Sequence, residues 1–381
     1  MEIELKHDIK PEDIRDALPS GKGGVGFLYH ATDWDTLSFS ICDLQPRTPE
    51  YEEALWNMKP RICAPIYEGN QLIGAHIVMP VAADMWLGKP SALKRFRETQ
   101  FLPALELAKQ AGLSMVAMGA STPYACNYGT MPREVPTPFI TTGHAATAGM
   151  LKTWAMHCCN EFSLNFSDSK IALFGAAGRL GVATARYLCH EETPKELILI
   201  DLPEKIGQLK KLALDLFASD LTMKMSIKVH VFDPAVPLPQ FDGAILTSSA
   251  TTPYLTAQDL ARAKFWIDDS HPRAASLEAE NAARNETLYI ECYARGPADL
   301  NVGYSFRLPT KQDCYTCFAE GYVAWRENVQ NDFVVGNPSV WTVSHVAKLL
   351  KKYDFNVGPY IGKSGASIGV RSISQPESLQ P

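Results

Sequence analysis

Hydrophobic and polar positions along this chain follow two patterns, and each pattern predicts a different kind of element. Short apolar and β-branched runs bounded by turn residues predict buried strands, and they recur from residue 25 to residue 293. These runs are 25–30, 37–42, 62–67, 72–81, 115–119, 170–174, 197–200, 226–232, 243–246, 264–268 and 288–293. Apolar residues at helical spacing predict helices over 91–112, 141–162, 182–188, 314–329 and 343–352. Pro103 is expected to kink or divide the first helix, since proline cannot donate a backbone hydrogen bond.

The strand at 170–174 leads directly into a glycine-rich turn and then a helix. Glycines at this position let the backbone turn tightly and approach a ligand, and the helix N-terminus offers N–H groups to a pyrophosphate. The spacing is GxxGxxG rather than the commoner GxGxxG, and the alternative is a glycine-rich turn with no ligand. We predict cofactor contacts from Gly175, Ala176, Ala177, Gly178, Arg179, Leu180 and Gly181.

An acidic residue, Asp201, closes the next strand and bears on the choice of cofactor. A carboxylate there accepts hydrogen bonds from ribose hydroxyls and repels a 2′-phosphate, and Leu202 stands where an NADP-binding chain often has arginine. These two residues favour NADH. Ligands lie beyond the carboxyl ends of parallel strands, so Thr247 and Ser248, which follow the strand at 243–246, are also predicted to contact the cofactor.

The order of elements then predicts an α/β chain. We expect a Rossmann-type, mostly parallel sheet of about six strands, an α+β N-terminal domain and a helical C-terminal segment. The predicted domains are an N-terminal substrate or carrier domain, a dinucleotide-binding domain, a helical segment, and a tail rich in Ser, Gly and Pro that lacks fixed structure. Their boundaries are 1–140, 141–300, 301–360 and 361–381.

Composition removes several classes of function. The net charge of −6 offers no basic excess for neutralising nucleic-acid phosphates, and no apolar run approaches the length of a membrane span. The nine cysteines are an odd number and are scattered, and the N-terminal stretch is charged rather than signal-like. We therefore expect reduced thiols in a cytoplasmic protein without integral membrane segments.

Two of these cysteines, Cys314 and Cys317, form a CxxC pair that allows several interpretations. A zinc site lacks a second pair of ligands, so no metal is predicted. A dithiol redox motif would be attached to the start of a βαβ unit, which this pair is not. Two interpretations remain. Either one of the two cysteines is a thiolate nucleophile at a helix N-terminus, or both are buried apolar residues.

Taken together, the chain resembles the cyanobacterial long-chain fatty acyl-[acyl-carrier-protein] reductases over roughly residues 70 to 355. The resemblance rests on KRFRETQFLPALELAKQAGLSMVAMG at 94–119, ITTG followed by threonine at 140–147, GAAGRLG at 175–181, WIDDSHP at 266–272 and CFAE at 317–320. It implies NADPH-dependent reduction of an acyl thioester to an aldehyde, with the acyl group carried on Cys317. The acyl donor would be acyl carrier protein or CoA, and an aldehyde-using enzyme would act downstream. The family has asparagine where His144 stands.

The remaining candidate residues follow from this reading. His144 and His271 are expected on loops facing the cleft, as donors of a proton to the developing oxyanion. Glu320 lies one turn after Cys317 and is expected to order the helix start or a neighbouring hydroxyl rather than lower the pKa of the thiol. Predicted hydrogen-bond partners of the substrate are Thr122, Thr142 and Thr147. Two alternatives stay open: a shikimate-dehydrogenase-like oxidoreductase with no covalent step, and a nucleotide-binding protein without turnover.

Overall fold

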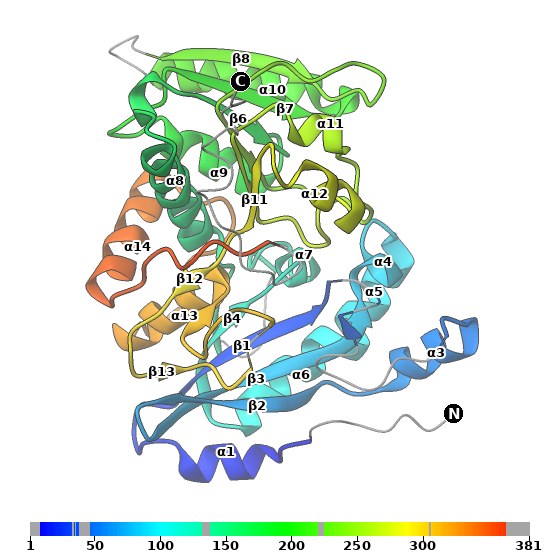
Figure 1. Cartoon of the computed structure of the whole chain (residues 1–381). Helices are drawn as coiled ribbons and strands as arrows, with labels where there is room; N and C mark the ends of the chain where they lie inside the picture. The colour runs from blue at the N-terminus through cyan, green and yellow to red at the C-terminus, as the bar shows by residue number, and fades with distance from the viewer. Residues whose placement is uncertain are drawn as a thin grey trace, which may run out of the picture. The chain divides into compact units, whose positions relative to one another are not determined.

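The computed structural model describes residues 8–32, 34, 36–37, 46–131, 138–219, 225–304 and 306–362. These residues form two compact units, each with its own six-stranded sheet (Figure 1). The predicted strand at 37–42 and the predicted tail at 361–381 lie almost wholly outside the described residues.

Neither unit is a continuous piece of chain. The first combines residues 1–146, 294–338 and 348–356, and the second combines 147–293, 339–347 and 357–381. Helices α8 (His144–Glu161) and α14 (Val340–Lys352) contribute residues to both units. The predicted domains are consecutive segments, so they do not describe this interleaving.

The sheet of the first unit is mixed. Its order is β13-β2-β3-β1-β4-β5, in which β3, β1, β4 and β5 run parallel, and β2 pairs antiparallel with β3 and β13. Strands β2 and β3 pair antiparallel and form a hairpin, with the turn between Glu68 and Gln71. The strands are β1 (Gly24–Ala31), β2 (Arg61–Glu68), β3 (Gln71–Ala82), β4 (Leu113–Met118), β5 (Phe139–Thr141) and β13 (Leu300–Asn301).

The helices of this unit include the one that Pro103 was expected to divide. The predicted helix at 91–112 is α-helical up to Phe96, widens to a π-helix over η1 (Arg97–Phe101), and resumes as α-helix in α6. The missing N–H of a proline at the start of α6 accounts for this break in the hydrogen-bond ladder. The helices are α1 (Pro11–Ala17), α3 (Pro49–Asn57), α4 (Ala83–Trp86), α5 (Pro90–Phe96), α6 (Leu102–Gln110), α7 (Thr122–Ala125) and α13 (Thr316–Arg326).

The sheet of the second unit is parallel throughout and confirms the predicted Rossmann-type fold. Its order is β11-β10-β9-β6-β7-β8, which numbers the strands 6-5-4-1-2-3 along the chain, the order of dinucleotide-binding folds. The strands are β6 (Lys170–Phe174), β7 (Glu196–Asp201), β8 (Ser226–Val231), β9 (Gly243–Leu246), β10 (Phe265–Asp268) and β11 (Leu288–Glu291).

Helices and a buried aromatic core complete this unit. The side chains of Phe174, Phe241 and Trp266 pack together in this core, with ring centroids 5.4–6.3 Å apart. Because the order of strands reverses beside β6, the loops after β6 and β9 flank the crevice where ligands of such sheets bind. The helices are η2 (Phe166–Asp168), α9 (Arg179–Leu188), η3 (Pro203–Lys205), α10 (Ile206–Ser219), α11 (Ala257–Leu260) and α12 (Leu277–Ala283).

Candidate functional site

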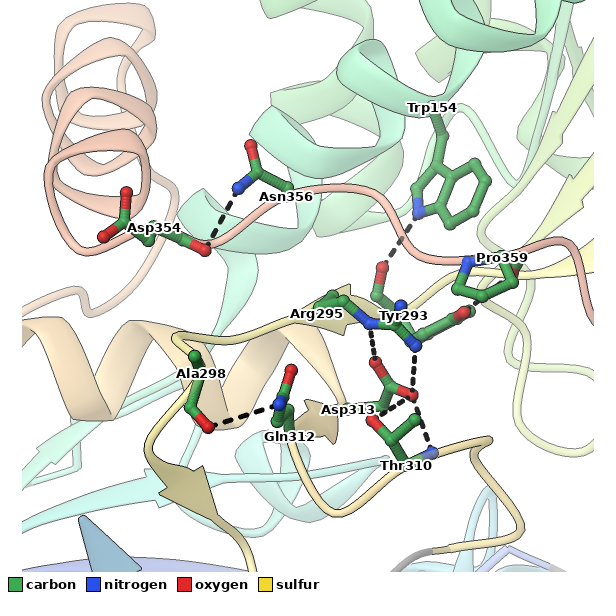
Figure 2. A network of polar contacts seen from close by, with 10 residues as sticks. All are labelled: Trp154, Tyr293, Arg295, Ala298, Thr310, Gln312, Asp313, Asp354, Asn356 and Pro359. Atoms are coloured by element: carbon green, nitrogen blue, oxygen red, sulfur yellow. Dashed lines mark hydrogen bonds and ion pairs between the residues drawn. The ribbon is translucent and has the colours of Figure 1, made fainter. Parts of the chain in front are cut away.

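The chain enters α13 of the first unit through a short, firmly held ladder of two strands, β12 (Ala294–Arg295) and β14 (Asp313–Cys314). Arg295 donates from Nε and Nη2 to the two Asp313 carboxylate oxygens at 2.9 and 3.0 Å (Figure 2). The Thr310 N–H and hydroxyl each donate to Asp313 at 2.8 Å, so this fully buried carboxylate is well satisfied. The ladder fixes the start of α13, and therefore the place of Cys317.

Helix α13 lies directly on β4 and β1 (Figure 1). Gly321 permits this close approach, since a Cβ at that position would stand 2.6 Å from the Ala117 Cβ. Phe318 packs into an aromatic cluster, with its ring centroid 5.8 Å from that of Phe27 and 6.1 Å from that of His76. The helix that carries Cys317 is thus anchored along its buried face.

The turn before α8 packs against Cys317 itself. Gly143 has φ +81°, and a Cβ there would overlap the Cys317 Cβ and stand 2.6 Å from its Cα. Only glycine therefore allows this turn to meet the start of α13. The turn follows β5, so Cys317 lies at the carboxyl end of a parallel strand, where ligands of such sheets bind.

Glu320, also on α13, holds the same turn. Its Oε1 accepts hydrogen bonds from the Thr141 hydroxyl at 2.5 Å and the Gly143 N–H at 2.7 Å, and its Oε2 accepts one from the Ala146 N–H at 2.8 Å. Glu320 is fully buried and caps the N-terminus of α8 from a neighbouring helix. Burial raises the pKa of its carboxyl to about 7, against the opposing effect of these hydrogen bonds. The helix start that Glu320 contacts is that of α8 rather than that of its own helix, and the neighbouring hydroxyl that it binds is that of Thr141.

The two cysteines of the CxxC pair differ sharply. Cys314 is buried, and burial, followed by Cys317 and Asp313, raises the pKa of its thiol well above the usual value. Cys317 is half-buried and is the second residue of α13, where backbone N–H groups favour a thiolate. Neither cysteine forms a disulfide, and no group of His, Cys, Asp or Glu among the described residues is placed to hold a metal ion.

Two buried threonine hydroxyls lie at the same edge of the sheet. Thr142 follows β5, and Thr122 is the first residue of α7, which follows the adjacent strand β4. Both side chains are almost completely buried, and neither Oγ1 has a hydrogen-bond partner within the part of the chain that the structure describes. Buried polar atoms are rarely left unpaired, so these hydroxyls are candidates for contacts with a bound substrate.

Sequence reasoning did not single out His30, which holds the loop carrying Thr122. Its Nδ1–H donates to the Ala31 carbonyl at 2.7 Å, and its Nε2 accepts the Ser121 N–H at 3.1 Å. Burial lowers the pKa of His30 to about 4, so the ring is neutral with one fixed tautomer. No motif marks this role, because a histidine within an apolar strand carries no local signal.

The predicted histidines fall in different units. His144 begins α8 in the first unit and is half-buried, with its ring centroid 5.5 Å from that of Tyr128. His271 belongs to the second unit, where its Nε2 is 3.8 Å from Glu291 Oε1. Thr147, on the second turn of α8, is buried and is also grouped with the second unit. Within the first unit, the structure brings together Cys317, Glu320, Thr142 and His144.

In the second unit, the glycine turn has the geometry that the sequence predicts. Gly175 has φ +71°, and a Cβ there would stand 2.8 Å from the Thr247 carbonyl oxygen. At Gly181 a Cβ would overlap the Gly175 carbonyl oxygen and stand 2.7 Å from the Ala176 Cα. Gly178 is the N-cap of α9. Glycine is thus needed for the turn and for the packing of α9, and the first N–H groups of α9 face the carboxyl edge of the sheet.

Asp201 ends β7 beside this turn. Its Oδ2 accepts the Ala177 N–H at 2.8 Å and its Oδ1 accepts the Leu202 N–H at 2.9 Å. Each carboxylate oxygen retains capacity for a second hydrogen bond, so ribose hydroxyls can still be bound. The Leu202 side chain is exposed and supplies no positive charge for a 2′-phosphate.

Thr247 and Ser248 line the loop after β9. The Thr247 hydroxyl donates to the Phe174 carbonyl at 2.8 Å, and the Ser248 N–H donates to the Ser270 hydroxyl at 3.1 Å. Asp268 in turn accepts the Ser270 N–H at 2.7 Å and the Tyr289 hydroxyl, so it shapes this loop. The loops after β6, β7 and β9 therefore meet at one edge of the Rossmann sheet.

A second set of contacts closes the end of this unit. The Trp154 indole donates to the Tyr293 carbonyl at 2.8 Å, and the Tyr293 hydroxyl donates to the Pro359 carbonyl at 2.6 Å (Figure 2). Tyr293 is fully buried at the point where the chain leaves the Rossmann sheet. This network is structural, since every polar atom named in it is satisfied within the unit.

Comparisons with known proteins add little beyond the fold. No protein-family model and no curated protein matches the sequence. Among solved structures, an Ael1 enzyme from Pseudomonas putida is similar at 13% identity and a TM-score of 0.36, covering 86% of this chain and 98% of that one. L-tryptophan dehydrogenase from Nostoc punctiforme is similar at 12% identity and a TM-score of 0.35, covering 87% and 80%.

A third likeness is confined to part of the chain. Malate dehydrogenase from Naegleria fowleri aligns at 14% identity and a TM-score of 0.25, covering 32% of this chain and 46% of that enzyme. This chain thus spans less than half of that enzyme's length. Likenesses this weak say nothing about what the chain acts on. Separately, no helix among the described residues is long and apolar enough to cross a membrane.

Proposed function

We propose that this chain is an NAD(P)H-dependent reductase that converts an acyl thioester to an aldehyde through an acyl group carried on Cys317. The observation that carries the proposal is the setting of Cys317. It is a half-buried thiol in the first turn of α13, packed against the turn after β5. The Thr142 hydroxyl lies in that turn and the Thr122 hydroxyl at the start of α7, and neither has a hydrogen-bond partner among the described residues.

The roles of the residues in the first unit follow from their contacts. Cys317 attacks the acyl carbonyl, and the backbone N–H groups at its helix start favour the thiolate form. Cys314 stays protonated, because it is buried beside Asp313 and Cys317. Thr122 and Thr142 offer hydroxyls to the carbonyl oxygen of the bound acyl group. Glu320 keeps the Gly143 turn against Cys317.

The second unit fits a nicotinamide dinucleotide. Gly175 and Gly181 leave room that a Cβ would fill, the start of α9 suits a pyrophosphate, and Asp201 suits a ribose. When bound, a reduced nicotinamide dinucleotide supplies the hydride. The absence of a cationic side chain at Leu202 supports NADH, whereas the family resemblance supports NADPH. The acyl donor is CoA or acyl carrier protein, both of which present the thioester on a phosphopantetheine arm.

The first test is intact-protein mass spectrometry after mixing with acyl-CoA or acyl-carrier-protein, with no nicotinamide present. We expect an acyl adduct on the wild type and none on Cys317→Ala. Cys189→Ala is the matched control, since Cys189 is the other half-buried cysteine among the described residues, and it should still be acylated. The acyl group transferred fastest would identify the substrate.

Other outcomes would point elsewhere. An adduct that persists in Cys317→Ala would assign the nucleophile to another residue. Turnover of a carbonyl substrate without any adduct would favour a dehydrogenase with no covalent step. Nucleotide binding with neither adduct nor turnover would favour a protein that binds the nucleotide without catalysis.

Cofactor preference is tested at Leu202, whose side chain is exposed and whose N–H bond to Asp201 does not depend on the side chain. We expect Leu202→Arg to tighten NADPH binding by roughly tenfold, because the guanidinium can pair with the 2′-phosphate. NADH binding should change little. Titration of both cofactors by fluorescence or calorimetry gives the ratio of Kd values. A variant that gains no affinity for NADPH would contradict this assignment of the ribose site.

A further inference from the structure

Residues 127–129 form an unusual stretch of backbone in the first unit. Asn127, Tyr128 and Gly129 have φ values of +48°, +58° and +79°, so two consecutive non-glycine residues adopt the left-handed conformation. Each such residue costs on the order of 1–3 kcal/mol and persists only where its surroundings enforce it. Strain of this kind is concentrated at functional sites, so the question is what the stretch holds in place.

Hydrogen bonds from two directions fix the backbone of Tyr128. Its N–H donates to the Pro123 carbonyl at 2.7 Å, and its carbonyl accepts the Gly336 N–H at 2.7 Å. The N–H of the next residue donates to the Cys126 sulfur at 3.2 Å. Tyr128 is therefore held between α7 and the segment that follows α13.

The ring held in this way lies against His144. The two ring centroids are 5.5 Å apart with an interplanar angle of 36°, and both side chains are half-buried. His144 directly follows Gly143, whose Cα faces the Cβ and Cα of Cys317. The imidazole is thus attached one residue from the point where the turn meets the thiol, and Glu320 anchors that turn.

We propose that His144 is the proton acceptor of the Cys317 thiol during acyl transfer, and that Tyr128 is the positioning residue that holds its imidazole. This rests on the proposed function. The proton on the Cys317 sulfur moves to the imidazole, and the sulfur forms a bond to the acyl carbon as the bond from that carbon to the carrier sulfur breaks. The imidazolium then returns the proton to the departing carrier thiolate. The step balances without an oxidant or a reductant.

Other titratable groups lie close enough to complicate a measurement of pH dependence. Cys314 precedes α13 and remains a protonated thiol, and the Tyr128 hydroxyl belongs to the loop after α7. Glu320 is the important one, because burial raises the pKa of its carboxyl to about 7. Its titration falls where an imidazole ordinarily titrates. The test therefore includes Glu320→Gln as a separate variant.

The experiment needs no nicotinamide. The rate of Cys317 alkylation by iodoacetamide, followed by peptide mass spectrometry from pH 5 to pH 10, reports the thiolate. The rate of thiol release from acyl-CoA reports acyl transfer. We expect His144→Gln to move the alkylation profile up toward that of an ordinary thiol, near pH 8.5, and to slow acyl transfer by roughly 10²- to 10⁴-fold. His144→Asn serves as a second variant if His144→Gln does not fold.

Variants at Tyr128 separate its ring from its hydroxyl. Tyr128→Phe keeps the ring against His144 and should retain most of the acyl-transfer rate, whereas Tyr128→Ala should lose roughly tenfold or more. Tyr67→Ala is the control and should leave the rate unchanged, because Tyr67 is a half-buried tyrosine on β2, a strand that three others separate from β5. If the inflection of the Cys317 alkylation profile shifted in Glu320→Gln but not in the His144 variants, the pH dependence would belong to that carboxylate and the proposal would be overturned.

The outcomes distinguish this proposal from the function on which it rests. A wild-type protein that forms no adduct with any acyl donor would overturn both. Normal acylation and an unchanged alkylation profile in the histidine variants would overturn the role of His144 alone. Wild-type rates in Tyr128→Ala would overturn the positioning role of Tyr128.

Discussion

At the scale of single residues, Glu320 shows how one buried group can join two helices. It belongs to α13, yet it accepts hydrogen bonds from the segment 141–146, which leads from β5 into α8. A carboxylate buried among backbone donors is stabilised by them and destabilised by the loss of water. Desolvation is the larger effect here, and it raises the pKa of Glu320 to about 7.

This pKa has a direct consequence for stability. The unfolded chain releases the proton near its ordinary pKa of 4.5, whereas the folded protein holds it to about pH 7. The free energy of unfolding therefore falls as pH rises between these values, by on the order of 3 kcal/mol in total. We expect the free energy of unfolding of Glu320→Gln, measured with denaturant from pH 4 to pH 8, not to show this fall.

The variant carries its own cost at any pH, because the glutamine NH₂ cannot accept the Ala146 N–H and leaves a buried donor unpaired, at roughly 1–3 kcal/mol. Glu327→Gln is the control, since Glu327 lies at the end of the same helix and pairs with Lys352 at the surface. If the free energy of unfolding of Glu320→Gln fell with pH as steeply as that of the wild type, the fall could not be assigned to Glu320.

At the scale of elements, the glycine turn between β6 and α9 shows where packing leaves no freedom. A Cβ at Gly181 would overlap the Gly175 carbonyl oxygen, whereas a Cβ at Gly207, in α10, would meet no atom within 4 Å. We expect Gly181→Ala to lose roughly 1–3 kcal/mol of stability and to weaken nucleotide binding at least tenfold. Gly207→Ala should bind the nucleotide as the wild type does, and its free energy of unfolding should rise by up to about 1 kcal/mol.

Thermal unfolding and nucleotide titration of the two variants measure both effects. If Gly181→Ala bound nucleotide as well as Gly207→Ala does, the turn would not be the pyrophosphate site. The comparison is fair because both substitutions add a single methyl group to a helix of the same unit.

Elements of this kind are also what the sequence predicts best. The β6–α9–β7 unit and Asp201 carry a local signature, because turn, helix start and strand end are encoded within about thirty residues. Tyr128 was missed because its ring contact with His144 depends on a left-handed stretch. Asparagine adopts that conformation more often than most residues, but tyrosine rarely does, so the sequence does not predict two such residues in a row. His30 was missed for a related reason, since the Ser121 N–H that its Nε2 accepts lies about ninety residues away.

At the scale of the whole molecule, the two groups of candidate residues belong to separate units. Cys317, Glu320, Thr142 and His144 lie in the first, and the glycine turn with Asp201 lies in the second. The Gly181→Ala variant should therefore still form the acyl adduct on Cys317 while losing nucleotide affinity. Loss of the adduct in that variant would show that acylation depends on the nucleotide-binding unit.

The interleaving of the chain was beyond sequence reasoning. The predicted domains are consecutive segments, because periodicity and turn signals report only local structure. Strand β13, paired with β2, and helix α13, packed on β4, join the first unit from more than 180 residues away. Such pairings are set by tertiary packing, which no single segment encodes.

This same interleaving orders events on the ribosome. The strands β1 to β5 emerge first, but the Gly143 turn has no Glu320 to bind until α13 has been synthesised. Residues 147–293 are translated in between. All six strands of the Rossmann sheet are therefore present in the nascent chain before Cys317 is synthesised. The nucleophile is therefore added after all six strands of the Rossmann sheet have been translated, and chains truncated before α13 carry those strands but no nucleophile.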